Sequence, residues 1–201
     1  MKKTLLMAAL AAAAVGGAFG GGEQAVSAFT DKRDGKVYRI VQIGRQVWMA
    51  ENLNFKAKGS KCYENKNANC DKYGRLYDWD TAIKACPAGY HLPFDKEWSR
   101  LENAVGGRST AGKKLKSARG WDNNGNGTDD YGFSALPGGE GSQEGYFYYA
   151  GDYGYWWSAT ENNADYTWGR FMVYDHEFVG GSTGRTNRSK TRLYSVRCVK
   201  D

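Results

Sequence analysis

The amino-acid sequence predicts a compact α+β domain that is rich in loops, and three observations support this fold class. The 201 residues include 27 Gly, 14 Tyr and 7 Trp but only 3 Pro, a composition that favours short strands, tight turns and the packing of large rings. Hydrophobic residues make up 41% of the chain, which is enough for one core. Short segments with helical periodicity also lie between alternating segments, although composition alone leaves an all-β module open.

The chain begins with the pattern of a Sec-type signal peptide and a short linker, residues 1–28, and continues as a single domain, residues 29–201. Two lysines precede an apolar segment, residues 5–15, which is far shorter than the ~20 residues of a membrane-spanning helix. Cleavage after Gly20 has better spacing than cleavage after Ala28. No later apolar run could span a bilayer, so we expect a secreted protein without a transmembrane segment.

The net charge argues against a nucleic-acid partner. It is formally +6, and a cleaved signal peptide would take Lys2 and Lys3 with it and leave +4. This mild basicity is too weak to predict binding to nucleic acid. Four basic residues near the C-terminus could meet an acidic polysaccharide or lipid head groups, but an exposed basic loop is the simpler interpretation. They are Arg185, Arg188, Lys190 and Arg192.

Four cysteines in an exported protein are candidates for disulfide bonds: Cys62, Cys70, Cys86 and Cys198. They allow three pairings, and sequence alone does not choose among them. The segment between Cys62 and Cys70 is polar, so a local bond would supply the restraint that it lacks, and Cys86 would then pair with Cys198. A zinc site is less favoured, because there is no Cys-x-x-Cys and the two histidines lie at unrelated spacings.

The first elements of the domain form a predicted hairpin and a short helix. Residues 36–43 and 46–50 alternate, and the two residues between them begin with Gly44, which is typical of a type II′ turn. Further on, Asp78 or Asp80 can cap a short helix. This helix must end near Cys86, because the following proline disfavours a helical conformation in the residue before it.

Two more helices are predicted in the middle of the chain. One begins around residues 93–95, with Trp98, Leu101 and Val105 on one face and a Gly-Gly pair at its end. The other covers residues 110–117, with Leu115 as its core contact. Three lysines would then form a solvated basic edge on this helix: Lys113, Lys114 and Lys116. Beyond residue 160, the segments 167–174 and 193–199 alternate and are predicted strands.

The aromatic-rich stretch that ends at residue 160 supplies the candidate binding residues. Rings stack on the apolar faces of sugars, while neighbouring Asp, Glu and Asn accept hydrogen bonds from hydroxyl groups. The candidates are Tyr148, Tyr149, Tyr153, Tyr155 and Trp156. About two-thirds of the aromatic residues in this stretch are expected in the core. Because neighbours on a strand face opposite sides, at most one of Trp156 and Trp157 would reach a ligand unless both faces are covered.

A partial calcium motif lies just before these rings. Asp122, Asn124 and Asn126 alternate and are followed by a glycine, as at the start of a calcium loop, and Asp129 and Asp130 could add charge. The twelfth position of the motif is a phenylalanine instead of a glutamate, so only weak affinity follows. The alternative is a turn held by its own Asn and Asp side chains, which requires no ion.

Several motifs carry a family resemblance. They are Asn126-Gly-Thr-Asp-Asp-Tyr-Gly-Phe-Ser-Ala-Leu-Pro-Gly-Gly139, Trp157-Ser-Ala-Thr160, Trp48-Met-Ala-Glu-Asn-Leu53 and Ser195-Val-Arg-Cys-Val199. With these motifs, residues 29–201 resemble the Fibrobacter succinogenes major paralogous domain family. One departure is Phe94, where relatives place a Ser or Thr that caps the helix, and Asp95 is a candidate replacement.

The resemblance implies a fold similar in layout to C-type-lectin-like domains and to formylglycine-generating enzymes. In that layout, two to three short helices pack on twisted antiparallel sheets, and long irregular loops lie on one side. A bond between Cys86 and Cys198 suits this architecture, because it would join an early helical region to the last strand. Fold alone does not establish function.

Three classes of function remain. The favoured one is a non-catalytic binding module, secreted or on a bacterial cell surface, that recognises glycan or other surface material through its loops. The alternative is a structural subunit that assembles with itself. An enzyme of the formylglycine-generating kind is less favoured, because that chemistry requires a reactive thiol pair and the four cysteines are better explained as structural bonds. We therefore expect no enzymatic activity, and calcium is the one candidate cofactor.

Overall fold

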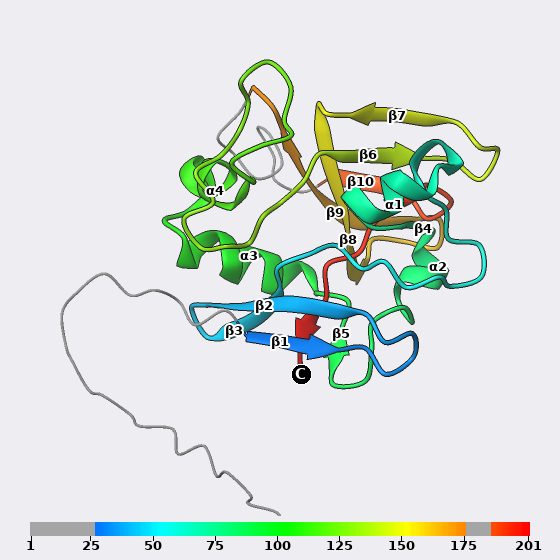
Figure 1. Ribbon diagram of the computed structural model, residues 1–201, viewed down its shortest axis with the longest axis horizontal. Helices are drawn as coiled ribbons and strands as arrows, with labels where there is room; N and C mark the ends of the chain where they lie inside the picture. The colour runs from blue at the N-terminus through cyan, green and yellow to red at the C-terminus, as the bar shows by residue number, and fades with distance from the viewer. Residues whose placement is uncertain (1–26, 176–185) are drawn as a thin grey trace, which may run out of the picture.

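The computed structural model describes residues 27–175 and 186–201, which form an α+β fold (Figure 1). Two curled sheets, mainly antiparallel, make up the body of the molecule. Helices α3 (Asp95–Ala104) and α4 (Arg108–Leu115) lie on one side of the sheets, and smaller helices lie on the other. The predicted α+β class is confirmed. The predicted signal peptide lies outside the described residues, apart from its last two positions.

The first sheet is built around the predicted hairpin. Its order is β1 (Ser27–Thr30), β2 (Val37–Ile43), β3 (Gln46–Met49), β12 (Val199–Lys200) and β5 (Tyr90–His91). Ile43 pairs with Gln46, and Gly44 has φ +60 while Arg45 does not have a positive φ, as a type II′ turn requires. A Cβ on Gly44 would also lie 3.1 Å from Cβ of Ala104, so the turn packs closely against α3.

The second sheet carries the aromatic strands. Its order is β10 (Thr186–Ser189), β9 (Tyr166–Val173), β8 (Tyr153–Glu161), β11 (Tyr194–Ser195) and β4 (Leu76–Tyr77). Strand β6 (Gly138–Gly141) pairs with β8 in parallel and with β7 (Phe147–Ala150) in antiparallel orientation. The β6–β7 hairpin therefore extends from the sheet along one edge of the molecule (Figure 1).

The C-terminal segment corrects one prediction. Residues 193–199 were expected as one strand, but they contribute β11 to the second sheet and β12 to the first. The three residues between these strands cross from one sheet to the other. At the crossing, Arg197 is completely buried and donates to backbone oxygens of Met49, Phe133 and Ser134. A single continuous strand could not pair with strands of both sheets, because the strands of each sheet have their own direction and their own pairing partners.

The three predicted helices are present, together with two short elements that were not predicted. The described residues contain η1 (Tyr63–Asn65), α1 (Asn67–Tyr73) and α2 (Trp79–Ala82) besides α3 and α4. Asp78 caps α2, since its side chain accepts a hydrogen bond of 2.8 Å from the Thr81 amide. On α3, the predicted face of Trp98, Leu101 and Val105 is fully buried.

The start of α3 differs from the expectation that Asp95 would replace a missing cap. The Glu97 carboxylate accepts the Phe94 amide at 2.8 Å, and Oγ1 of Thr160, on β8, accepts the Asp95 amide at 2.9 Å. The carboxylate of Asp95 instead forms an ion pair of 2.5 Å with the buried Arg170. The missing cap is thus replaced by one local acceptor and one from a distant strand.

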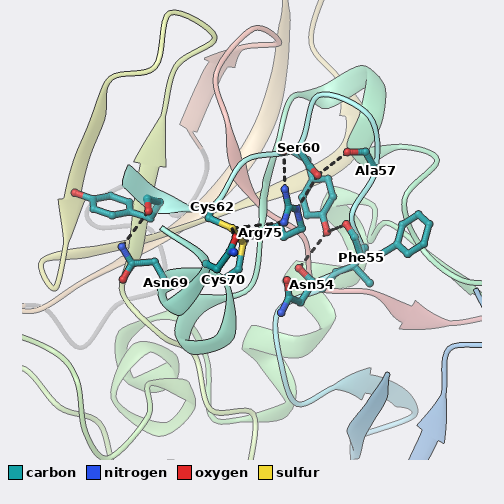
Figure 2. The surroundings of a disulfide bond; sticks show 12 residues. Asn54, Phe55, Ala57, Ser60, Cys62, Asn69, Cys70 and Arg75 are labelled. Atoms are coloured by element: carbon teal, nitrogen blue, oxygen red, sulfur yellow. Dashed lines mark hydrogen bonds between the residues drawn. A yellow bond between two sulfur atoms is a disulfide. The ribbon is translucent and has the colours of Figure 1, made fainter. Parts of the chain in front are cut away.

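The segment between Cys62 and Cys70 was expected to be a polar loop, but it contains the start of helix α1. The described residues therefore contain more α-helices than the two to three expected. Both predicted disulfide bonds are present, Cys62–Cys70 (Figure 2) and Cys86–Cys198, so all four cysteines are paired. The short bond holds α1 at Cys70, and Tyr73 is buried at its end. These tertiary restraints stabilise a helix whose polar sequence has low intrinsic propensity.

Strand β8 separates two hydrophobic clusters. Trp156 belongs to one cluster with Trp48 and Trp98, and Trp157 belongs to the other with Tyr77. Both indoles of β8 are fully buried, because the two faces of the strand are both covered. The alternation expected for neighbouring tryptophans is therefore confirmed, and neither of them reaches solvent.

The basic edge predicted on α4 is wrong for Lys116. Its side chain is buried, and its ammonium group donates to the carbonyl oxygens of Val173 and Tyr174, each at 3.1 Å. Lys116 follows the last turn of α4 in an extended conformation and forms a bridge to Ala135. Because the chain has left the helix at this point, the side chain points into the protein instead of along the helix face.

Asn52 connects the crossing segment to the rest of the core. Its side-chain oxygen accepts from Nε1 of Trp156 at 2.8 Å and from two nitrogens of Arg197 at 3.0 and 2.8 Å. Its amide nitrogen donates to the Tyr73 carbonyl at 2.8 Å. Burial lowers the pKa of Arg197 to about 9, so the guanidinium remains charged at neutral pH with neutral oxygens as its hydrogen-bond partners.

Candidate functional site

The structure divides the predicted binding residues into a buried and an accessible group. Tyr155 and Trp156 are 4% and 0% exposed, so their prediction as binding residues is wrong. They lie on the part of β8 that both clusters cover, which leaves no face open to a ligand. Tyr148 and Tyr149 are 43% and 49% exposed, and Tyr153 is half-buried beside them. We call Tyr148, Tyr149 and Tyr153 the tyrosine surface.

An unusual backbone conformation builds this surface. Adjacent residues of a strand normally point to opposite faces, yet the rings of Tyr148 and Tyr149 have centroids only 5.9 Å apart. Tyr149 has φ +67, the left-handed region that bulky residues rarely adopt. This conformation interrupts the alternation of β7. The second ring is thereby brought next to the first and next to Tyr153, whose centroid is 5.3 Å away.

The exposed rings rest on buried ones. Tyr153 stacks on Tyr155 with centroids 5.5 Å apart and an interplanar angle of 3°, and Tyr155 stacks on Tyr194 at 5.0 Å. Burial raises the pKa of Tyr153 and of Tyr155. Their hydroxyl groups therefore stay protonated and remain hydrogen-bond donors at neutral pH. Because the row continues into the core, the rings at its accessible end lie on a rigid base.

Charged groups border the tyrosine surface. Glu140 pairs with Tyr148 across the β6–β7 hairpin, which puts both side chains on one face. The Glu140 carboxylate forms an ion pair of 3.4 Å with Arg192, and the guanidinium of Arg188 lies 5.3 Å from the Tyr155 ring centroid. Arg188 and Arg192 were expected in an exposed basic loop. Instead, Arg188 belongs to β10 and is half-buried against the aromatic row.

No local pattern in the sequence predicts that these charged groups lie beside the tyrosine surface. Arg192 and Glu140 are 52 residues apart, and their approach depends on the pairing of strands across the second sheet. The alternation of the 138–150 region could have predicted a hairpin around the turn at residues 142–146. Such a hairpin would have placed Glu140 beside Tyr148, but not the two arginines.

Two residues of the calcium motif accept hydrogen bonds from backbone amides. Asn126 accepts the Trp121 amide at 3.0 Å, and Asp129 accepts the amide and hydroxyl of Ser134 at 2.7 and 2.6 Å. The motif also includes Asp122, Asn124 and Asp130. Within residues 27–175 and 186–201, no three His, Cys, Asp and Glu side chains form a group that could hold a metal ion. Calcium binding stays a prediction, and a melting temperature that does not change at millimolar calcium would contradict it.

None of the helices in the described ranges has the length and apolar character needed to cross a bilayer.

A search of curated proteins and a search of solved structures found no match. A family model described as the Fibrobacter succinogenes major domain matches residues 41–200, which is most of the chain and includes every residue of the tyrosine surface. The chain belongs to the Fibrobacter succinogenes major domain family.

Proposed function

We propose that this protein is a secreted, non-catalytic binding module and that it binds glycan on the tyrosine surface. The observation that carries the proposal is the left-handed conformation of Tyr149, with φ +67. A bulky residue in this conformation costs on the order of 1–3 kcal/mol, and such strain is concentrated at functional sites. Here the strained conformation places Tyr149 beside Tyr148 and leaves about half of its side chain exposed.

The chemistry of the surface suits a sugar. Tyrosine rings offer flat apolar faces that stack on the C–H face of a pyranose, and their neutral hydroxyl groups donate hydrogen bonds. Arg192, whose side chain is 43% exposed, adds a donor for sugar hydroxyls at the border of the rings, and its ion pair with the buried Glu140 holds it there. The rigid base of stacked rings reduces the entropy lost on binding, because the accessible rings are already held in place.

Two features support the other parts of the proposal. Disulfide bonds persist in oxidising compartments, so the two bonds agree with export to the cell surface or beyond. They also engage all four cysteines, which leaves none of the thiols that formylglycine-generating chemistry requires. We further propose a C-type-lectin-like fold, supported by the α+β architecture and by the Cys86–Cys198 bond between an early helical region and the C-terminal segment.

A binding assay with paired variants tests the function. Wild-type protein should be retained on one or more plant or bacterial polysaccharides on a glycan array. The Tyr148→Ala/Tyr149→Ala variant should bind at least about tenfold more weakly than the wild type, because both accessible rings are lost. Tyr166→Ala is the control, since Tyr166 is 42% exposed on a different strand and should leave binding unchanged. Equal losses in both variants, or no wild-type binding across the array, would contradict the proposal.

Self-assembly is the second candidate function. Strand β7 pairs only with β6 among the described strands, so its outer edge is open to a strand from another molecule. The same strand carries Tyr148 and Tyr149, and Tyr146 before it is 63% exposed. Sedimentation velocity over a wide concentration range separates the two functions. A glycan-binding module should remain monomeric without ligand, whereas a structural subunit should associate as its concentration rises.

A further inference from the structure

A concave surface near the turn of the β6–β7 hairpin differs in chemistry from the tyrosine surface. This cavity of about 410 Å³ is lined by three cationic side chains, Lys56, Lys61 and Arg75, together with the polar Ser60, Asn65 and Asn67. Among the described residues that line it, none is acidic. We call it the cationic pocket.

Arg75 forms its base and has only neutral hydrogen-bond partners within the described chain. Its Nε donates to Oγ of Ser60 at 2.8 Å, and Nη2 donates to the Ser60 carbonyl at 2.9 Å. Its Nη1 lies 3.5 and 3.4 Å from the sulfur atoms of Cys62 and Cys70. Figure 2 shows the guanidinium beside this disulfide bond. The disulfide bond and Ser60 therefore hold the guanidinium in place without neutralising its charge.

Neither Lys56 nor Lys61 forms an ion pair within the described residues, and Glu144, whose carboxylate interacts electrostatically with Lys61, does not line the pocket. The ammonium group of Lys61 donates to the carbonyl oxygen of Gln143 at 2.8 Å, a neutral partner. Nearby surface lysines differ, because Lys66 pairs with Glu64 at 2.8 Å and Lys36 pairs with Asp34 at 3.6 Å. A concave site with several cations and no carboxylate attracts an anion, and a guanidinium fork suits oxyanions in particular.

We propose that the cationic pocket binds an oxyanion, the carboxylate or sulfate group of an acidic polysaccharide. The hydrogen bond between Lys61 and Gln143 joins the pocket to the hairpin that carries Tyr148 and Tyr149 of the tyrosine surface. The identification of the oxyanion as part of a polysaccharide rests on the proposed glycan-binding function. The pocket narrows that function to acidic polymers, because a neutral sugar would leave the cations without a counter-charge.

Titration calorimetry with three probes tests the inference: inorganic sulfate, an oligogalacturonate, and a neutral oligosaccharide of the same length. Wild-type protein should bind the oligogalacturonate more tightly than sulfate and more tightly than the neutral oligosaccharide. The Lys56→Ser/Lys61→Ser variant should bind sulfate and oligogalacturonate about tenfold more weakly, since two charged donors are lost.

Lys58→Ser/Lys66→Ser is the matched control, because it removes the same charge from two exposed lysines that do not line the pocket. It should bind both anions like the wild type, and the melting temperatures of both variants should show that they remain folded. Equal weakening of anion binding in both variants would show that the effect depends only on the overall charge of the protein, and it would overturn the proposal. Wild-type binding of sulfate without preference for oligogalacturonate would overturn the polysaccharide part.

The tyrosine variant separates failure of this inference from failure of the proposed function. Tyr148→Ala/Tyr149→Ala should still bind sulfate at the cationic pocket, because its rings do not line that cavity. If wild-type protein binds neutral glycan but neither anion, the tyrosine surface remains supported and the pocket is rejected. If it binds sulfate but no glycan of any kind, the function proposed for the tyrosine surface is rejected.

Discussion

The middle and the start of strand β8 show how one pattern of residues gives a buried and an accessible region. In the middle of the strand, Trp156 and Trp157 are fully buried, and their indole nitrogens donate to Asn52 and to the Tyr77 carbonyl. At the start of the strand, Tyr153 is only half-buried and contacts the exposed Tyr149. Both parts of the strand are aromatic, so cover by other elements determines which rings are core and which are accessible.

The interior and the accessible region also differ in the unfavourable features that they contain. The interior contains buried charge but satisfies it: Arg170 pairs with Asp95 and Glu102, and Arg197 is surrounded by hydrogen-bond acceptors. The accessible end instead contains the strained backbone of Tyr149. Changes in the interior should therefore alter mainly stability, and changes at the accessible end should alter mainly binding.

The disulfide bonds should show the largest effect on stability. Cys198 is fully buried, and the Cys86–Cys198 bond joins residues 112 positions apart. Replacing both cysteines by serine should lower the free energy of unfolding by ~4–5 kcal/mol, compared with ~2–3 kcal/mol for Cys62→Ser/Cys70→Ser, because the longer loop gains more entropy when it opens. Urea denaturation of both variants measures this order, and a larger loss from the short bond would contradict it.

Asn52 should have a slightly smaller effect, which tests whether the interior depends on satisfied charge. Asn52→Ala removes an acceptor from Arg197 and from Trp156, and should cost about 3–5 kcal/mol because a buried cation is left with fewer partners. Asn54→Ala is the control and should stay within about 0.5 kcal/mol, since Asn54 is only half-buried. Similar losses in the two variants would show that Asn52 does not hold the crossing segment.

Substitutions at Tyr149 should alter binding more than stability. Tyr149→Gly should be more stable than Tyr149→Ala by about 1 kcal/mol, because glycine adopts φ +67 without steric cost and alanine does not. Both variants should lose glycan retention, since both lack the ring. Urea midpoints together with the array assay measure the two effects. A glycine variant no more stable than the alanine variant would show that the backbone at this position is not strained.

The smallest expected effect is a pH dependence at the start of α3. Burial opposes the charge of His91, but hydrogen bonds to Asp201 at 2.7 Å and to Glu97 at 2.9 Å outweigh it and raise the pKa of His91 above its usual 6.5. A raised pKa means that the folded state binds the proton more tightly. This stabilisation is therefore complete below about pH 6.5 and is lost as the pH rises through the folded-state pKa.

The stability difference between wild type and His91→Gln should accordingly shrink from about pH 6 to about pH 9. Urea midpoints across this range provide the measurement. A difference that is constant with pH would mean that the ion pairs of His91 do not contribute to folding. The Glu97→Gln variant should reduce the pH dependence in the same way, because it removes one of the two carboxylates.

The sequence by itself determined the elements whose signals lie within about ten residues. The hairpin around Gly44 depends on local alternation and a turn that only glycine forms easily, and the buried face of α3 depends on the spacing of Trp98, Leu101 and Val105. The polar segment between Cys62 and Cys70 favoured a local bond, and the remaining pair followed from it. The aromatic residues of the sequence also indicated that the 146–157 region supplies the rings of the candidate site.

Only the tertiary structure decided which of those rings are accessible, because burial depends on elements that are distant in the sequence. Tyr155 is buried by Tyr194, nearly forty residues further on, whereas Tyr149 is 49% exposed. The same holds for the division of the last strand between two sheets and for Arg188 beside the aromatic row. Local periodicity specifies the face on which a side chain lies, but the chain must fold before that face is covered or left open.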